Sequence, residues 1–203
     1  MAVVERESPV ELSRAKRLKC ETRASHERLD ASIMAAEPFA SRARYGLFVK
    51  VQHAFHREID ALYDDAALHG LLPDLAGRRR LALIAQDLTD LGLAAPAPDK
   101  APVFRPGEAP DFATALGWLY VAEGSNLGAA FLLKGAEKLG LSETFGARHL
   151  GAAPEGRGLH WKTFVAALDG IDVSESGEER VCAGARAAFA HVQDQTARFM
   201  SRP

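Results

Sequence analysis

The sequence predicts an all-α protein built as one domain. Through most of the chain, apolar residues recur every three or four positions, which is the period of an amphipathic helix. The alternating pattern of a half-buried strand does not occur convincingly, and there is no internal repeat. We therefore expect helices packed around a single core over residues 1–203, with residues 1–8 as a flexible tail.

The composition is that of a water-soluble globular protein, with 47% hydrophobic and 26% charged residues. The formal net charge of −2 argues against sequence-independent binding of nucleic acid, which requires a basic surface. No uncharged apolar run reaches the roughly 18 residues of a membrane span, and the first residues lack the order of a signal peptide. Cys20 and Cys182 do not suggest a disulfide framework. We expect a cytoplasmic monomer that does not bind membranes.

Two helices are expected in the first third of the chain. The tetrapeptide Ser-Pro-Val-Glu at residues 8–11 has the form of a capping box with proline at the first helical position, so a helix should begin there and end before Pro38. A second helix is expected over residues 41–62, because aromatic and aliphatic residues recur there at helical spacing. It is expected to continue, bent, through residues 66–71.

The remaining helices are separated by proline- and glycine-rich connections. Residues 78–91 form an amphipathic pattern, and residues 93–110 a proline-rich loop. A long apolar helix is expected over residues 111–139, followed by a short one near residues 161–169. A capping box at residues 176–179 predicts the start of the last helix.

The helix expected over residues 111–139 carries four glycines on one face. Gly117, Gly124, Gly128 and Gly135 are seven, four and seven residues apart. Each glycine inside a helix costs about 0.5–1 kcal/mol relative to alanine. Such a stripe predicts either close packing of another helix or the close approach of a flat ligand, and spacing alone does not choose between them.

Among the seven histidines, His26 has the most suggestive neighbours. Asp30 follows four residues later, so its carboxylate can bind one ring nitrogen and leave the other for a metal. Lys19, seven residues earlier on the same face, could meet an anionic group. The alternatives, a histidine with a local ion pair and a solvated lysine, are more frequent on spacing alone.

Gln52 and His56 form another pair four residues apart, on the second expected helix. A buried glutamine needs partners, so Gln52 could organise water or bind a neighbouring backbone group. The other histidines have no compelling partners in the sequence; they are residues 53, 69, 149, 160 and 191. Ser125 does not lie in a nucleophile elbow, and phosphate-loop and dinucleotide-binding motifs do not occur.

The segment TRASH at residues 22–26, together with GWLYVAEGSNLGAAFLLK at residues 117–134, resembles bacterial heme oxygenases, in particular the biliverdin-forming group. The likeness extends through FGARHL and WKTFVAALDGI and covers roughly residues 12–200. It implies a helical fold that holds heme between a proximal and a kinked distal helix. In that fold His26 would be the axial ligand of the heme iron, with Asp30 as the carboxylate that orients it.

The resemblance also implies roles on the opposite side of the heme. Gly124 and Gly128 match the distal-helix glycines that lie over the heme and leave room for dioxygen. Animal-type members carry an aspartate directly after the first of these glycines, where this chain has Ser125, which the resemblance implies contacts the heme. Proton delivery is therefore expected through waters near Gly124 and Gln52, with His56.

Lys19, Tyr120 and Lys134 are expected to bind the heme propionates, the first two as in members that attack the α-meso carbon. The implied reaction consumes heme b, O2 and electrons and forms α-biliverdin, Fe2+ and CO. The chain has no flavin or nicotinamide motif, so the resemblance implies a ferredoxin or an NAD(P)H-dependent reductase as donor. Lys16 and Arg17, with Lys19, are the candidate docking surface.

Two alternatives share much of this pattern. A heme-binding or heme-storage protein would also need His26, but it would not turn heme over. A thiaminase-like enzyme would share the helical architecture without heme. It would require a cysteine nucleophile in a central pocket, and neither Cys20 nor Cys182 is obviously placed for that role.

Overall fold

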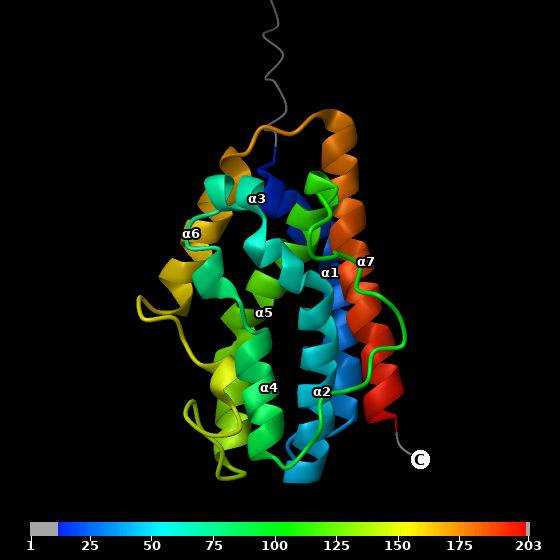
Figure 1. The fold of residues 1–203 in the computed structure, drawn as a ribbon, viewed down its shortest axis with the longest axis vertical. Helices are drawn as coiled ribbons and strands as arrows, with labels where there is room; N and C mark the ends of the chain where they lie inside the picture. The colour runs from blue at the N-terminus through cyan, green and yellow to red at the C-terminus, as the bar shows by residue number, and fades with distance from the viewer. Residues whose placement is uncertain (1–11, 202–203) are drawn as a thin grey trace, which may run out of the picture.

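The structure is a computed structural model that describes residues 12–201, and in that range it contains helices and no strand (Figure 1). The α-helices are α1 (Arg14–Ala35), α2 (Arg42–Ile59), α3 (Ala66–Leu71), α4 (Leu81–Asp90), α5 (Phe112–Glu137), α6 (Arg157–Gly170) and α7 (Glu175–Met200). Short 3-10 helices are η1 (Asp60–Asp64), η2 (Ala76–Arg78) and η3 (Arg148–Leu150). The predicted all-α class is therefore confirmed.

Each of the long helices begins directly after a residue whose side chain caps its first turn. Ser13, Ser41, Asp111 and Ser174 each accept a hydrogen bond from the backbone N–H three residues later, which satisfies one of the free donors of a first helical turn. The predicted start of the last helix is thus wrong by two residues, because Ser174 rather than Ser176 is the cap.

The predicted boundaries of the first two helices also differ from the observed ones or lie outside the described residues. The capping box at residues 8–11 and the tail at residues 1–8 lie outside the described residues, and in the described part α1 begins at Arg14. The second helix was expected to reach Leu62, but α2 ends at Ile59 and the chain tightens into η1. α3 occupies the predicted continuation.

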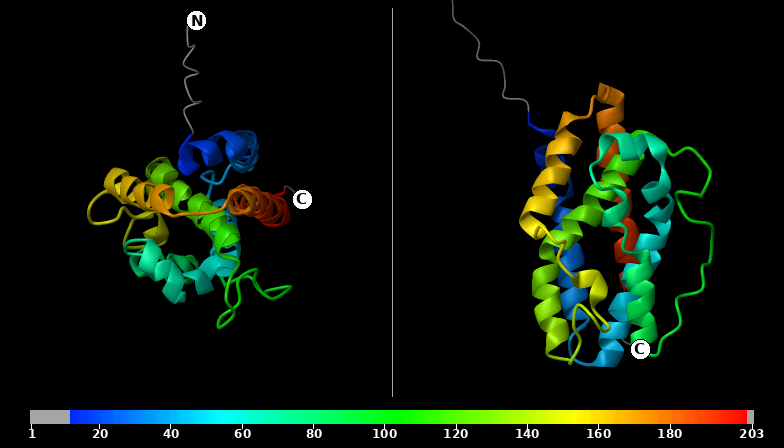
Figure 2. Two further views of the ribbon diagram at one scale, coloured as in Figure 1. Left: turned by 90° about the horizontal axis from the view of Figure 1, so that it is seen from above. Right: turned by 60° about the vertical axis from the view of Figure 1, so that its left-hand side comes forward.

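α7 is the helix on which the others assemble, because α1, α2 and α5 all pack against it. α1 and α5 also both contact α6, but they do not pack extensively against each other (Figure 2). Apolar side chains from these helices form the core; among them are Leu18, Phe48, Phe55, Leu119, Phe164 and Val181. α1 and α5 are therefore held by shared neighbours rather than by direct contact.

The start of α1 is fastened to α6 and α7 by a buried arginine. The Arg14 guanidinium donates to the carbonyl oxygens of Leu168 and Ile171, and it pairs with Glu178 at 2.6 Å. The backbone N–H of Ala15 donates to Asp169 at 2.8 Å. These bonds fix where α1 enters the bundle.

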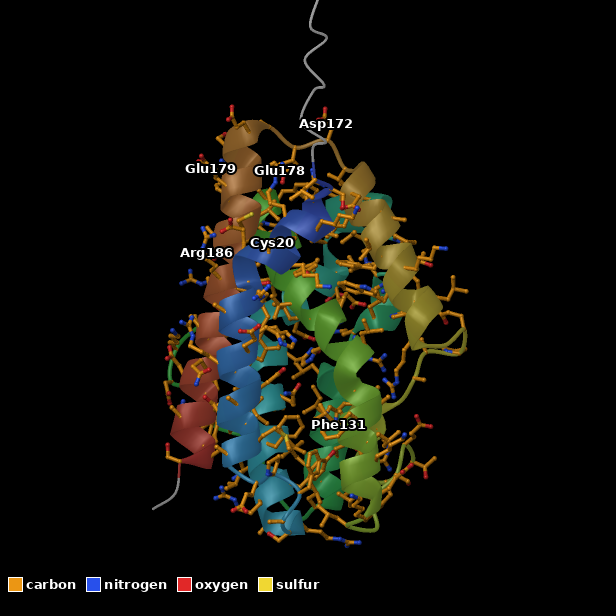
Figure 3. The ribbon with its side chains drawn as sticks, turned by 180° about the vertical axis from the view of Figure 1, so that it is seen from behind. Cys20, Phe131, Asp172, Glu178, Glu179 and Arg186 are labelled. Carbon is orange, nitrogen blue, oxygen red and sulfur yellow. The ribbon has the colours of Figure 1, made fainter. Side chains whose placement is uncertain are left out.

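α5 and α7 approach so closely that glycine is required on both helices. A Cβ atom at Gly117 would lie 2.2 Å from the carbonyl oxygen of Val181, and one at Gly184 would lie 2.4 Å from that of Thr114. α5 is continuous, but its axis changes direction near the middle (Figure 3). Among the described residues, no helix is long and apolar enough to cross a membrane.

Candidate functional site

His26 lies on an exposed face of α1 with one side of its ring already engaged. Its Nδ1 atom lies 3.0 Å from Oδ2 of Asp30, and both side chains are 61% exposed. The ring also packs edge-on against Phe189 of α7, with 5.8 Å between the centroids. The contact predicted from the spacing is therefore confirmed. With Nδ1 facing a carboxylate, Nε2 is the ring nitrogen available to a metal.

The glycine stripe of α5 divides into two kinds of position. Cβ atoms at Gly117 and Gly135 would collide, the latter with the Phe39 ring at 2.7 Å. A Cβ atom at Gly128 would meet nothing within 4 Å, and one at Gly124 would meet only the Trp161 ring, at 3.8 Å. The middle pair therefore borders open space.

Exposed apolar side chains lie next to these open positions on α5, and another lies on α1. Leu127 and Phe131 of α5 are 44% and 66% exposed, and Met34, two turns after His26 on α1, is 46% exposed. Figure 3 shows Phe131 on the face of the molecule where α1 and α5 are both visible. Adjacent exposed apolar side chains commonly mark a ligand-binding surface. Together with a free imidazole nitrogen, they suit a flat apolar ligand that carries a metal, as heme does.

The propionate candidates do not lie together. Tyr120 precedes Gly124 by one turn; burial raises its pKa, as do the nearby Cys20 of α1 and Asp169, so the phenol stays protonated and can donate. Lys19 is the exposed neighbour of Cys20. Lys134 lies fourteen residues beyond Tyr120, which is about 21 Å along the helix. The structure thus brings Lys19 and Tyr120 to the same end of the site and places Lys134 at the other.

Ser125, expected to contact the heme, and the expected proton-delivery residues Gln52 and His56 are in different environments. The Ser125 hydroxyl donates to the carbonyl oxygen of Ala122 at 2.7 Å, so it is engaged within its own helix. Gln52 is half-buried on α2. His56 is buried, and its pKa is lowered to about 3, mainly by burial and then by His149, Arg80 and His53. A neutral His56 can pass a proton at neutral pH but does not act as a cationic acid.

Sequence reasoning missed a buried charged cluster behind Gly124. Arg78 of η2 and Glu123 of α5 pair at 2.7 Å, with both side chains 1% exposed. Nε2 of His160 lies 3.5 Å from the same carboxylate, and its Nδ1 lies 2.7 Å from Glu155. A glutamate within the most apolar helix was the available signal, since a buried charge requires a partner.

A second cluster joins α4 to η3. Asp87 accepts hydrogen bonds from the His149 ring at 2.7 Å and from two backbone N–H groups. Burial would raise the pKa of Asp87, but these hydrogen bonds outweigh it and lower that pKa. The prediction that the five remaining histidines lack partners is wrong for His149 and His160, and also for His69, which bonds the Tyr63 carbonyl oxygen. Partners distant in sequence cannot be seen from spacing.

Several buried polar atoms in this interior have no hydrogen-bond partner among the described residues. They are the Tyr63 hydroxyl, His56 Nδ1, Arg80 Nε, Glu123 Oε1, His149 Nε2 and His160 Nε2. Buried polar atoms without a protein partner are normally bonded to ordered water. The side of α5 that faces η1, η2 and α4 is therefore a polar, water-requiring interior.

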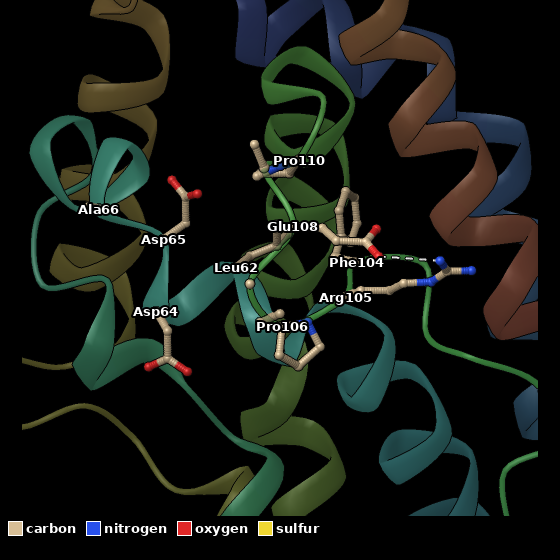
Figure 4. A pocket seen from close by; sticks show the side chains of 12 residues that line it. Leu62, Asp64, Asp65, Ala66, Phe104, Arg105, Pro106, Glu108 and Pro110 are labelled. Carbon is tan, nitrogen blue, oxygen red and sulfur yellow. Dashed lines mark hydrogen bonds and ion pairs between the residues drawn. The ribbon is translucent and has the colours of Figure 1, made fainter.

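A separate cavity of about 270 Å³ lies between η1 and the loop of residues 104–110 (Figure 4). Asp64 and Asp65 border it on one side, and the ion pair of Arg105 and Glu108, at 3.3 Å, borders it on the other. None of its lining residues belongs to α1 or α5. This cavity is distinct from the site around His26.

The chain is similar to known proteins over nearly all of its length. The heme oxygenase family model matches residues 12–196. The chain is 45% identical to heme oxygenase PigA of Pseudomonas aeruginosa over 176 residues, which cover 87% of each protein. It superposes on the crystal structure of the NO- and CO-bound heme oxygenase of Neisseria meningitidis with a TM-score of 0.86 and 41% identity, over 94% of this chain and 93% of that one. The chain therefore belongs to the heme oxygenase family, whose members are heme-degrading oxidoreductases.

Proposed function

We propose that this chain binds heme between α1 and α5 and cleaves it to biliverdin, Fe2+ and CO. One observation carries the proposal: His26 has Nδ1 held 3.0 Å from Asp30, and the nearby α5 has bare backbone at Gly124 and Gly128. An oriented imidazole suits an axial ligand, and a helix without side chains leaves room for a diatomic molecule.

The residues divide the work between the two helices. Heme, when bound, is both the substrate and the oxygen-activating cofactor. His26 binds its iron, and Asp30 with Phe189 holds the imidazole ring in place. Gly124 and Gly128 let the backbone approach the opposite face of the heme. Protons reach this face through water held in the polar interior that includes Gln52 and His56.

The orientation of heme in its plane follows from the charged end of the site. Lys19 and Tyr120 lie at the same end and present an ammonium group and a protonated phenol to the two propionates. Lys134 is too far along α5 to share that edge. We therefore assign the propionates to Lys19 and Tyr120, and this seating favours the α isomer of biliverdin.

Electrons come from a separate ferredoxin or NAD(P)H-dependent reductase in the cytoplasm, and the chain acts as a monomer. Lys16 and Lys19 are exposed on α1, whereas Arg17 lies 3.7 Å from Glu178. Figure 3 shows Glu178 and Glu179 at this end of the molecule. The docking surface therefore centres on Lys16 and Lys19 rather than on a uniform basic patch.

Addition of heme and then ascorbate to the purified protein tests turnover. The Soret band should be lost while a broad biliverdin band grows at about 680 nm, a property of the pigment itself. His26→Ala should lose five-coordinate binding and turnover. A stable ferrous-oxy spectrum with full recovery of heme would instead identify a storage protein, and normal iron ligation in His26→Ala would refute the ligand assignment.

Chromatography of the biliverdin product tests the seating. The wild-type chain should form mainly the α isomer, and Lys19→Asn should shift the isomer ratio because one propionate loses its cation. Lys134→Asn is the matched control, and it should leave the ratio unchanged. Predominant β or δ product from the wild type would rule out the seating at Lys19 and Tyr120.

A further inference from the structure

Glu123, the residue before Gly124, is connected to the protein surface through the side chains of His160 and Glu155. Glu155, on the connection before α6, has a side chain that is 38% exposed, and its Oε1 lies 2.7 Å from Nδ1 of His160. His160 is buried, and its Nε2 lies 3.5 Å from Oε2 of Glu123. These three side chains lie in a line from solvent to the residue beside Gly124, with one hydrogen bond at the outer step and a 3.5 Å gap, without a hydrogen bond, at the inner step.

Arg78 fixes the inner end of this line. Its Nη1 donates to Oε2 of Glu123 at 2.7 Å, its Nε to the Pro73 carbonyl oxygen at 3.0 Å, and its Nη2 to the carbonyl oxygen of His160 at 3.2 Å. The guanidinium also lies over the Phe164 ring. Because Arg78 holds one oxygen of Glu123, the carboxylate keeps a set orientation. Its other oxygen, Oε1, has no partner among the described residues.

The electrostatic environment of Glu123 comes from four elements. Burial raises its pKa, while Arg78 of η2, His160 of α6 and Arg80 before α4 oppose that rise. Tyr63 of η1 interacts with it as well. The hydrogen bond from His160 lowers the pKa of Glu155. The inner carboxyl group is thus the better proton acceptor of the two, and His160 is coupled to both.

We propose that Glu155, His160 and Glu123 form a proton relay from solvent to the inner side of Gly124. The relay rests on the proposed function, which consumes protons at the distal face. It supplies what Ser125 does not, since the Ser125 hydroxyl is bonded to Ala122. Glu123 hands its proton to water at Oε1, so it acts through water and does not touch the heme.

Each step of the relay moves one proton and no electron. The His160 imidazolium transfers its Nε2 proton to Oε2 of Glu123 when the two atoms, 3.5 Å apart in the structure, close to hydrogen-bond distance. Protonation neutralises the Glu123 carboxylate and weakens its ion pair with Arg78, so the carboxyl group can rotate and release that proton to water on the Oε1 side. The neutral His160 ring then turns and is protonated again by a solvent proton that arrives through Glu155. The net result is one proton taken up at Glu155 and one released beside Gly124.

Turnover and heme titration of three variants test the relay. Glu123→Gln should retain heme affinity but slow heme cleavage by about 100-fold, the lower end of the range for lost acid–base assistance. Glu155→Gln should cause a smaller loss and a larger solvent deuterium isotope effect, because proton delivery then limits more of the rate. It leaves the buried Arg78–Glu123 pair intact, so its fold is secure. Glu137→Gln changes an exposed glutamate of α5, the helix that carries Glu123, and is the matched control. Its rate of heme cleavage should equal that of the wild type. Wild-type rates in both Glu123→Gln and Glu155→Gln would overturn the relay.

A second measurement needs no heme. The infrared band of the protonated Glu123 carboxyl group, assigned by its loss in Glu123→Gln, can be titrated in the ligand-free protein. His160→Gln should raise the pKa of Glu123, because the opposing positive charge is removed. An unchanged titration would overturn the coupling. Failure of the wild-type chain to turn heme over would refute the proposed function instead, so the two failures are distinguishable.

Discussion

Two parts of α5 use glycine for opposite reasons. At Gly117 the α7 backbone occupies the space of a side chain, with Val181 oxygen 2.2 Å from the position of a Cβ atom. At Gly128, about three turns further on, no atom lies within 4 Å of that position. The first glycine contributes to packing. The second costs about 0.5–1 kcal/mol of helix stability with no contact in return, so it is explained by a ligand rather than by the fold.

The contrast extends to what lies beneath each part of the helix. The seam between α5 and α7 is lined by small and apolar residues such as Leu116 and Ala185. The segment near Gly124 borders a polar interior with the buried charges Arg78 and Glu123. The end of α5 that packs against α7 is therefore apolar and contributes to stability, whereas the middle of α5 faces polar residues near the proposed heme site. Three substitutions, ordered by their expected effect on the free energy of unfolding, test this division.

The largest effect is expected at the packed seam. Gly117→Ala places a methyl group against the backbone of Val181 and Ala185, which can move only if the helices separate. The free energy of unfolding should fall by about 3 kcal/mol, the upper end for overpacking. Urea denaturation measures it. Gly135→Ala is the comparison, with a smaller loss because the Phe39 ring can turn away. Equal stability of Gly117→Ala and wild type would contradict the close seam.

An acid titration probes the polar interior. His56 has a pKa of about 3 in the folded protein against an ordinary value of 6.5, so it stays neutral when folded while the unfolded chain binds a proton. Its contribution is complete above pH 6.5. As the pH falls towards 3, it lowers the free energy of unfolding by about 1.4 kcal/mol per pH unit.

His56→Gln should therefore flatten the pH dependence of thermal unfolding between pH 6 and 4 relative to wild type. Gln86→Ala, at an exposed position without a titrating side chain, provides the control and should keep the wild-type slope. If His56→Gln and wild type show the same slope, His56 is not neutral in the folded interior.

The smallest change in stability, and the only gain, is expected at the open glycine. Gly128→Ala should raise the free energy of unfolding by about 0.5–1 kcal/mol, because the helix loses its glycine and the methyl group meets no atom. Heme turnover should fall in the same variant, since the methyl group enters the space left for the ligand. A stabilised variant with undiminished turnover would show that Gly128 does not border the heme.

The helical architecture was predictable because its signals are local. Apolar spacing identified each long helix, and the i, i+4 spacing of His26 and Asp30 predicted a contact that the structure contains. The ends of helices were harder to predict. Ser174 and Ser176 are equally good caps by residue type, and only the turn after α6 selects Ser174.

The polar interior could not be predicted in the same way. Asp87 meets His149 across 62 residues, and Arg78 meets Glu123 across 45. Such pairs depend on how the helices pack, which no short spacing records. The distance between Lys134 and Tyr120 also depends on the helix that carries them. Residue types that can bind a propionate do not show by themselves whether two such residues reach the same edge of the heme.

α7 supplies no group to the proposed heme ligation, yet α1 and α5 both rest on it. The distance between α1 and α5 is therefore set by α7, through side chains such as Phe189, which contacts His26. A change of side-chain volume on α7 would widen or narrow the site while α1 and α5 kept their sequence. Variation in this helix is a way to accommodate differently substituted porphyrins without altering the residues that bind them.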